Sequence, residues 1–201
     1  MRATRRTIVF GLAAAGSLAA VLGTALADEY AKLKVLLPPA PGAQACYART
    51  YDKAHLAEHP KQKVTEMIFS LRYTTLGEDE AHLVATEGGG VEKQYFDYDF
   101  TLAAKVRDQS KTLYTSGDCT SLEGIGCGVD CDGGGVQIEP VPGQNDTILV
   151  RLDRDYSYIR MSLGCSEGED FELKAGEDDK VFKLTKTPAA ACNAMETDAR
   201  K

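Results

Sequence analysis

The chain has 201 residues, with 23 Lys and Arg against 30 Asp and Glu, and a formal net charge of −7. An acidic chain is a poor candidate for binding nucleic acid or anionic membranes, because phosphates attract positively charged surfaces. The length suits one domain with a substantial core, since a domain of about 150 residues buries about 70% of the surface of its extended chain.

Residues 1–27 have the pattern of a cleaved signal peptide. Three arginines within the first six residues precede an apolar run over residues 8–22, and Ala-Leu-Ala at residues 25–27 is a small-x-small cleavage motif. The apolar run is shorter than the roughly 20 residues of a membrane span. We therefore expect a periplasmic or secreted protein that begins at Asp28 and has no membrane span after cleavage. The paired arginines leave open whether the general or the twin-arginine route exports it.

Residues 28–45 are predicted to be a lead-in outside the folded domain. Residues 33–37 suit a short strand or an apolar tether, and the proline-rich segment 38–42 suits a stiff, extended linker. We expect one β-rich domain over residues 46–192, followed by a C-terminal tail over residues 193–201.

Most of the domain shows the alternation of apolar and polar residues that is typical of β-strands. The clearest case runs from Phe96 to Ala104; a second runs from Met67 to Tyr73, although Ile68 breaks it. Alternation implies one buried and one solvated face, as in antiparallel sheets. The sequence therefore predicts an all-β, mainly antiparallel barrel or sandwich of about 8–10 short strands. Residues 171–174 and 181–184 are expected to form a final hairpin.

One short N-terminal helix is predicted between Tyr51 and His59. Asp52 can cap its start, and Pro60 ends it at or before His59. A helix of about two turns is marginal alone, so packing has to hold it.

His55, Glu58 and His59 match His-x-x-Glu-His, the inverted motif of zinc proteases. Two imidazoles four residues apart lie on one helical face and can bind one zinc ion, with the glutamate as general base. Pro60 speaks against this interpretation, because proteases with the motif carry it in a long helix of an α/β scaffold. We favour a short surface helix with locally packed histidines. A zinc site or a metal-dependent hydrolase is the alternative.

Six cysteines in an exported chain predict three disulfides. They are Cys46, Cys119, Cys127, Cys131, Cys165 and Cys192. Because the first opens the domain and the last closes it, we favour a Cys46–Cys192 disulfide, which closes the kind of long loop that the chain-entropy model rewards most. The spacing leaves the pairing of the other four open.

Residues 119–135 hold three cysteines and six glycines. We expect an irregular, crosslinked crossing between two halves of the β-fold. The start at Asp130 resembles a calcium loop, but Gly134 and Val141 occupy positions that need oxygen ligands. A glycine-rich turn at a disulfide is the favoured interpretation. The acidic pairs and triplets at residues 97–99 and 177–179 are expected to be solvated.

Three short segments resemble an uncharacterised family of small exported bacterial proteins. They are residues 46–51 (Cys-Tyr-Ala-Arg-Thr-Tyr), residues 55–60 with His55-Leu56 and His59-Pro60, and residues 129–134 (Val-Asp-Cys-Asp-Gly-Gly). The resemblance implies no activity, ligand or site residue.

The chain contains no nucleophile-elbow, P-loop, dinucleotide-binding or haem-attachment motif. We therefore expect a non-enzymatic exported β-domain without a cofactor that binds a partner protein or a small ligand, either in an inner cavity or at its loop ends. A structural or inhibitory envelope protein would instead have a fully packed interior.

Overall fold

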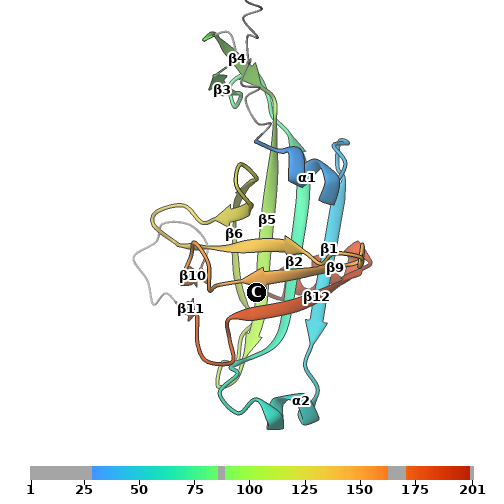
Figure 1. Cartoon of the computed structure of the whole chain (residues 1–201), viewed down its shortest axis with the longest axis vertical. Coiled ribbons are helices and arrows are strands. Elements are labelled where there is room, and N and C mark those ends of the chain that lie inside the picture. Colours follow the sequence, from blue (N-terminus) through green and yellow to red (C-terminus); the bar gives the residue numbers. More distant parts are fainter. Residues whose placement is uncertain (1–28, 86–88, 163–170, 200–201) are drawn as a thin grey trace, which may run out of the picture.

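A computed structural model describes residues 29–85, 89–162 and 171–199, so the predicted signal peptide lies outside the described residues. The main body is a closed barrel of antiparallel strands in the order β1, β12, β9, β8, β7, β6, β5 and β2 (Figure 1). Consecutive barrel strands are neighbours, and the first and last strands, β1 and β12, also pair. The predicted all-β antiparallel fold is confirmed, and it is a barrel.

The bounds of the elements are as follows. The barrel strands are β1 (Gln44–Thr50), β2 (Val64–Thr75), β5 (Phe96–Val106), β6 (Leu113–Thr120), β7 (Ile125–Gly128), β8 (Gly135–Pro140), β9 (Thr147–Arg151) and β12 (Val181–Thr187). Two separate pairs are β3 (His82–Ala85) with β4 (Val91–Gln94), and β10 (Tyr158–Arg160) with β11 (Glu172–Lys174). The helices are α1 (Ala31–Leu36), α2 (Lys53–Glu58) and α3 (Ala189–Ala199).

The alternating residues of β2 and β5 fill the barrel interior. Because successive side chains of a strand point to opposite faces, every second residue reaches the core. Phe69 and Leu71 of β2 lie opposite Leu102 and Phe100 of β5, and all four are at most 1% exposed. The rings of Phe69 and Phe100 are stacked with centroids 6.0 Å apart.

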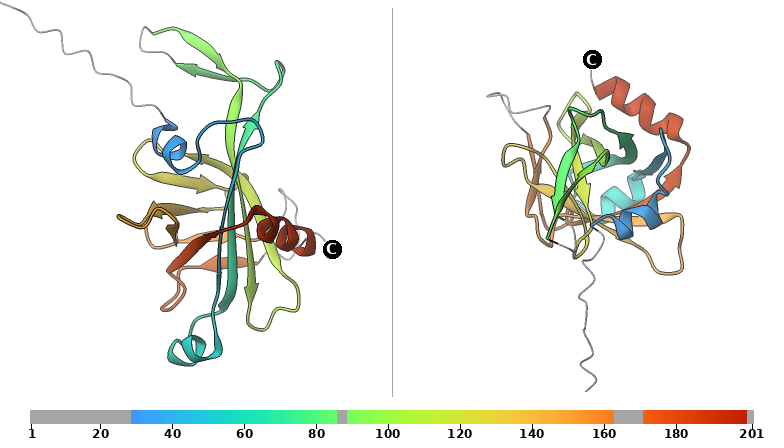
Figure 2. Two further views of the ribbon diagram at one scale, coloured as in Figure 1. Left: turned by 90° about the vertical axis from the view of Figure 1, so that its right-hand side faces the viewer. Right: turned by 90° about the horizontal axis from the view of Figure 1, so that it is seen from above.

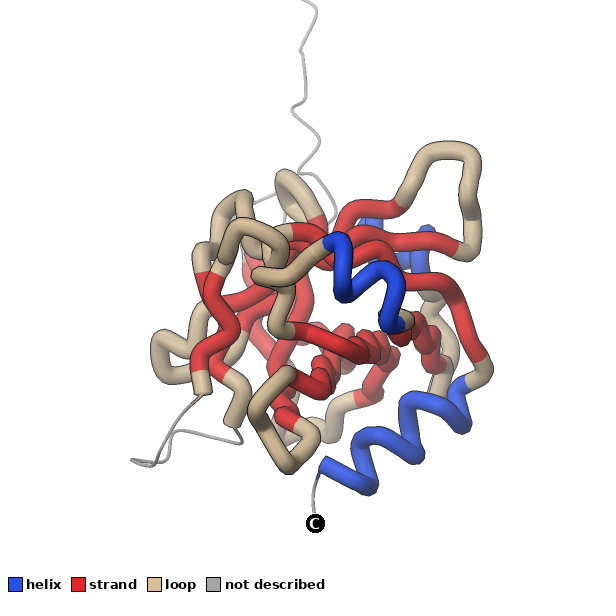
Figure 3. The backbone as a smooth tube through the Cα atoms, turned by 90° about the horizontal axis from the view of Figure 1, so that it is seen from below, coloured by secondary structure: helices blue, strands red, loops and turns tan. Residues whose placement is uncertain are grey.

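Helix α3 covers the residues that break this alternation. Ile68 of β2, Ala103 of β5 and Tyr114 of β6 form a second buried cluster with Cys192 and Met195 of α3. Figure 3 shows α3, which leads to the C-terminus, along the outside of the strands. The expectation of a tail after residue 192 was therefore wrong, because these apolar side chains on the outer wall need a cover.

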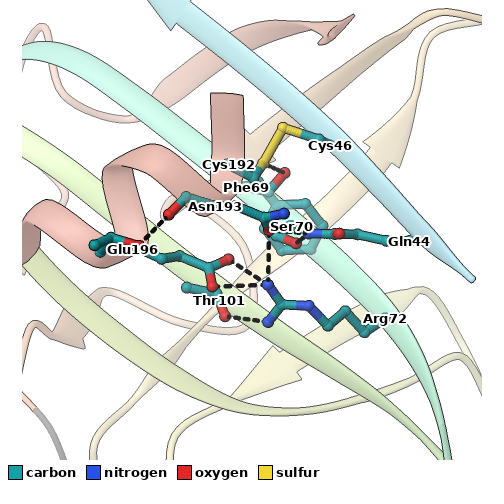
Figure 4. A network of polar contacts seen from close by, with 10 residues as sticks. Gln44, Cys46, Phe69, Ser70, Arg72, Thr101, Cys192, Asn193 and Glu196 are labelled. Carbon is teal, nitrogen blue, oxygen red and sulfur yellow. Dashed lines mark hydrogen bonds and ion pairs between the residues drawn. A yellow bond between two sulfur atoms is a disulfide. The ribbon is translucent and has the colours of Figure 1, made fainter. Parts of the chain in front are cut away.

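Polar contacts and a disulfide fix α3 on the barrel (Figure 4). Nη2 of Arg72 on β2 lies 2.8 and 2.7 Å from the two carboxylate oxygens of Glu196 on α3. The amide of Gln44 on β1 donates to Oδ1 of Asn193 on α3 at 3.3 Å. The disulfide Cys46–Cys192, which the sequence favoured, joins β1 to the same helix.

The lead-in also belongs to the domain. Tyr30, Leu33 and Leu37 are buried in the same core as the barrel interior. The hydroxyl of Tyr98 donates to the carbonyl oxygen of Leu37 at 2.9 Å, which ties the end of α1 to β5. The predicted lead-in, residues 28–45, instead contains helix α1, a turn and the first residues of β1, because its apolar side chains are buried in the core.

Two further local expectations were wrong. The stretch 119–135 is crosslinked and contains a turn over residues 129–134, but it joins neighbouring strands and does not cross between two halves: Cys119 of β6 lies directly opposite Cys127 of β7, and the two form a disulfide. The expected final hairpin does not form either, since β11 pairs with β10, and β12 pairs with β9 and β1. Alternating residues identify a strand but do not identify its neighbour.

The predicted short helix forms as α2, at the lower end of the barrel in Figure 1. Asp52 caps it by accepting a hydrogen bond from the backbone N–H of His55 at 2.8 Å. His59 is the C-cap residue, directly before Pro60.

Candidate binding surface

The barrel interior is filled by side chains. Aromatic residues from four strands are at most 1% exposed: Tyr47, Phe69, Tyr98, Phe100 and Phe182. An eight-stranded barrel is just wide enough for side chains to fill it or to hold one small ligand. Here bulky rings occupy this space, so a binding site has to be sought on the outer surface.

One open groove of about 620 Å³ lies between α1 and strands β7 and β8. Ile125 and Ile138, each 2% exposed, form part of its lining. Lys32 and Arg154 line it together with acidic groups such as Asp155. Charges of both signs around a shallow apolar floor select no class of ligand, so the groove does not support a specific proposal.

The β3–β4 pair projects beyond the barrel, above β5 in Figure 1 and in the left view of Figure 2. We call residues 82–85 and 91–94 the arm. These two strands form a sheet of their own and pair with no other strand among the described residues. A two-stranded hairpin is marginally stable in water. The arm therefore depends on contacts at its base or on a partner.

Contacts on one face of the arm hold it to the barrel. His82 Nε2 lies 2.9 Å from Asp97 Oδ2 on β5. This hydrogen bond, and then the charge of Asp97, raise the pKa of His82. The side-chain amide of Gln94, which is paired with His82, donates to the hydroxyl of Tyr30 and to the carbonyl oxygen of Phe96, both at 3.0 Å.

The other face of the arm exposes large apolar side chains. Leu83 is 72% exposed and Val91 is 66% exposed. The register pairs Leu83 with Lys93, and alternation along the strands places Leu83, Lys93 and Val91 on one face. Tyr95, at the base of the arm, is 42% exposed. Val35 and Leu122 are also exposed, but the arm places two large apolar side chains on one face of a projecting two-stranded sheet.

Three carboxylates crowd together on the barrel wall below the arm. Oxygen atoms of Asp97, Asp99 and Asp118 all lie within 4.8 Å of one another, and Asp99 lies opposite Asp118 on the neighbouring strand. Desolvation, and then the charges of Asp99 and Asp97, raise the pKa of Asp118 to about 6. Thr74 Oγ1 donates to Asp99. Three oxygen ligands fall short of the six to eight that Ca²⁺ takes, so this geometry by itself defines no ion site.

The predicted metal residues lie together on α2 but already have local contacts. The ring centroids of His55 and His59 are 4.4 Å apart, and Tyr51 stacks on His55 at 4.7 Å. His55 Nε2 lies 3.0 Å from Oε1 of Gln62, whose amide donates to the carbonyl of Val64. The amide oxygen can only accept, so His55 Nε2 carries the proton and donates.

Glu58 is exposed at the end of the same helix. Among the described residues, a group of three possible ligands close enough to hold an ion occurs at Asp97, Asp99 and Asp118 and does not include the α2 histidines. The structure thus brings no third ligand to them, and the motif match has no supporting geometry.

The cysteines hold the fold rather than a site. Cys46–Cys192 and Cys119–Cys127 are disulfides, with sequence separations of 146 and 8 residues. Cys131 is disulfide-bonded as well, and Cys165 lies outside the described residues.

One acidic residue that we expected to be solvated is buried. Asp179 is 2% exposed and accepts hydrogen bonds from the backbone N–H groups of Lys63 and Val64 at 2.7 and 3.2 Å. Burial raises its pKa, although these two hydrogen bonds oppose the shift. Its role is to fix the start of β2, and the sequence alone gives no sign of this contact.

Comparison with protein-family models, curated proteins and solved structures found no match. None of the helices in the described part of the chain has the length and apolar character needed to cross a membrane. The arm and its surroundings therefore have to be interpreted from their own geometry.

Proposed function

We propose that this protein is an exported, non-enzymatic β-barrel that binds a partner protein through the arm. The observation that carries the proposal is the exposure of Leu83 and Val91 on one face of a two-stranded sheet that projects from the barrel. Burying apolar area contributes about 25 cal/mol per Å², so a partner that covers this face gains stability for the complex.

The filled interior supports an outer-surface function. Rings such as Phe69, Phe100 and Phe182 occupy the space where a barrel would hold a small ligand. The export part of the proposal rests on the signal-peptide pattern of residues 1–27 and on the disulfides, which persist in oxidising compartments.

Site-specific photo-crosslinking tests the arm as the binding surface. A photoreactive amino acid replaces Leu83 in the full-length protein in its own cells, and a matched protein carries it at Lys183, an exposed position on barrel strand β12. We expect a discrete crosslinked species from position 83 that is absent from position 183. The substitution Val91→Ser should weaken that species without lowering the melting temperature, because Val91 is exposed. Identical patterns from both positions would refute the proposal.

A further inference from the structure

We propose that the segment bound by the arm is an extended strand of alternating apolar and basic residues, which pairs with the free edge of β3. This inference rests on the proposed function and specifies its partner. It is carried by the edge of the arm, by the two different faces of its sheet and by the charge of the surrounding segment.

The edge of β3 is open to a further strand. β3 pairs with β4 on one side, and no strand of the described residues lies on its other side. Such an edge presents unpaired N–H and C=O groups, and extended peptides bind by adding a strand there. The barrel is closed and offers no comparable edge. A third strand would also give the arm the number of strands that an independently stable sheet needs.

The faces of the arm define the side chains of the added strand. One face carries Leu83, Val91 and Lys93, which contacts Glu78, and the opposite face carries Val84, Glu92 and His82, which pairs with Asp97. Because side chains alternate between the faces of a sheet, a strand beside β3 would direct every second residue to each face. Apolar residues suit the first face and basic residues suit the second.

The charge of the segment around the arm favours a basic partner. Residues 76–99 contain seven acidic residues and a single Lys or Arg, Lys93, which already contacts Glu78 at 3.2 Å. Asp118 on the neighbouring barrel strand adds another carboxylate at the base. A second copy of the chain would bring two acidic arms together, and like charges facing each other are unfavourable. A basic segment of another protein avoids this repulsion.

Synthetic peptides test the inference directly. The first probe is a ten-residue peptide that alternates valine and lysine. The second replaces each lysine by glutamate, and the third carries proline at one central valine and at the neighbouring lysine, so that one missing N–H group faces β3 in either register. Binding to the mature protein is followed by amide shifts in NMR spectra and by amide hydrogen exchange.

We expect the valine–lysine peptide to slow exchange of the backbone amides of residues 82–85 at least tenfold, and salt to weaken its binding. The glutamate and proline peptides should leave these amides unchanged. Equal binding of the proline peptide, or shifts centred on another part of the barrel, would overturn the inference.

Two double variants separate a local site from general attraction between opposite charges. Asp79→Lys/Glu92→Lys changes the segment around the arm, whereas Glu58→Lys/Asp146→Lys makes the same change of charge at exposed positions elsewhere. We expect the first to raise the Kd of the valine–lysine peptide at least tenfold and the second to raise it less than twofold. Equal effects would refute a site on the arm.

The two proposals can fail separately. If position 83 still crosslinks to a discrete partner while the valine–lysine peptide does not protect β3, the arm remains the binding surface and strand addition is rejected. If neither experiment gives a signal at the arm, both are rejected.

Discussion

Arg72 on β2 and Glu196 on α3 form an ion pair across 124 residues of sequence, with Nη2 2.8 and 2.7 Å from the two carboxylate oxygens. The glutamate side chain is 9% exposed and that of the arginine 34%. Because little water reaches it, the Glu196 carboxylate depends on Arg72 to neutralise its charge. The ion pair also holds α3 to the barrel wall at a second point, in addition to the Cys46–Cys192 disulfide.

Glu196→Gln should lower the free energy of unfolding by about 1–2 kcal/mol, because it removes the charge that pairs with Arg72. Arg72 can still reach water, which keeps the loss below that of a fully buried pair. Urea unfolding measures the change. Glu66→Gln, which breaks the more exposed pair with Lys105, is the control and should cost less than about 1 kcal/mol. Equal losses would mean that the burial of Glu196 does not matter.

Leu33→Ala should destabilise the protein by about 2–4 kcal/mol, because Leu33 of α1 is fully buried in the barrel core. Val35 is on the same short helix but is 85% exposed, so Val35→Ala should change stability by less than about 0.5 kcal/mol. Equilibrium unfolding of the two variants compares a buried and an exposed residue of one segment. Similar small effects would show that the lead-in is not part of the cooperative unit.

Asp118→Asn should make the protein more stable above about pH 6 and should have little effect near pH 4. The folded-state pKa of Asp118, about 6, lies above its ordinary value of 3.8. The free-energy penalty of ionising Asp118 in the folded state is therefore absent below about pH 4 and is complete once the pH has risen above about 6. Since the residue is exposed, screening by water limits the gain to about 1 kcal/mol.

The measurement for Asp118 is the difference in melting temperature between wild type and variant over pH 4–8. Glu58→Gln on α2, an exposed carboxylate at the other end of the barrel, is the matched control and should give a flat difference. A flat difference for Asp118→Asn as well would mean that the three crowded carboxylates do not repel one another.

Zinc should not raise the melting temperature of the mature protein, and a chelator should not lower it. The reason is that His55 donates from Nε2 to Gln62, and no third ligand lies near the α2 histidines among the described residues. Thermal unfolding with and without zinc, for wild type and for His55→Ala/His59→Ala, checks this. If zinc raised the melting temperature of the wild type but not that of the double variant, the metal-binding alternative would be supported.

The strands of the core were predictable because each has one face inside and one face outside. Phe96 to Ala104 show this pattern, and the structure places Tyr98, Phe100 and Leu102 in the interior. A closed barrel and a sandwich give the same alternation, so the sequence left the two open. The helix α2 was predictable from Asp52 and Pro60, which act locally.

The elements that were missed are those whose position depends on distant residues. Ile68 breaks the alternation of β2 because its side chain lies on the outside of the barrel. It is buried there by α3, which lies more than 100 residues later in the chain. Leu33 and Leu37 have helical spacing, but only the core shows where they are buried. The arm was not predicted: residues 91–94 were not identified as a strand. That the two strands of the arm leave the barrel could not be read from Leu83 and Val91, because exposed and buried strands use the same residue types.

Because β1 pairs with β12, the barrel can close only late in the synthesis of the chain. It cannot close until its last strand has been made, and the disulfide between β1 and α3, the helix after that strand, joins cysteines 146 residues apart. Cys46 has to wait for Cys192, 146 residues later, although Cys119, Cys127 and Cys131 are made before it. Cys119 and Cys127 are only 8 residues apart and can find each other quickly. Early formation of the Cys119–Cys127 disulfide therefore removes two cysteines with which Cys46 or Cys192 could pair wrongly.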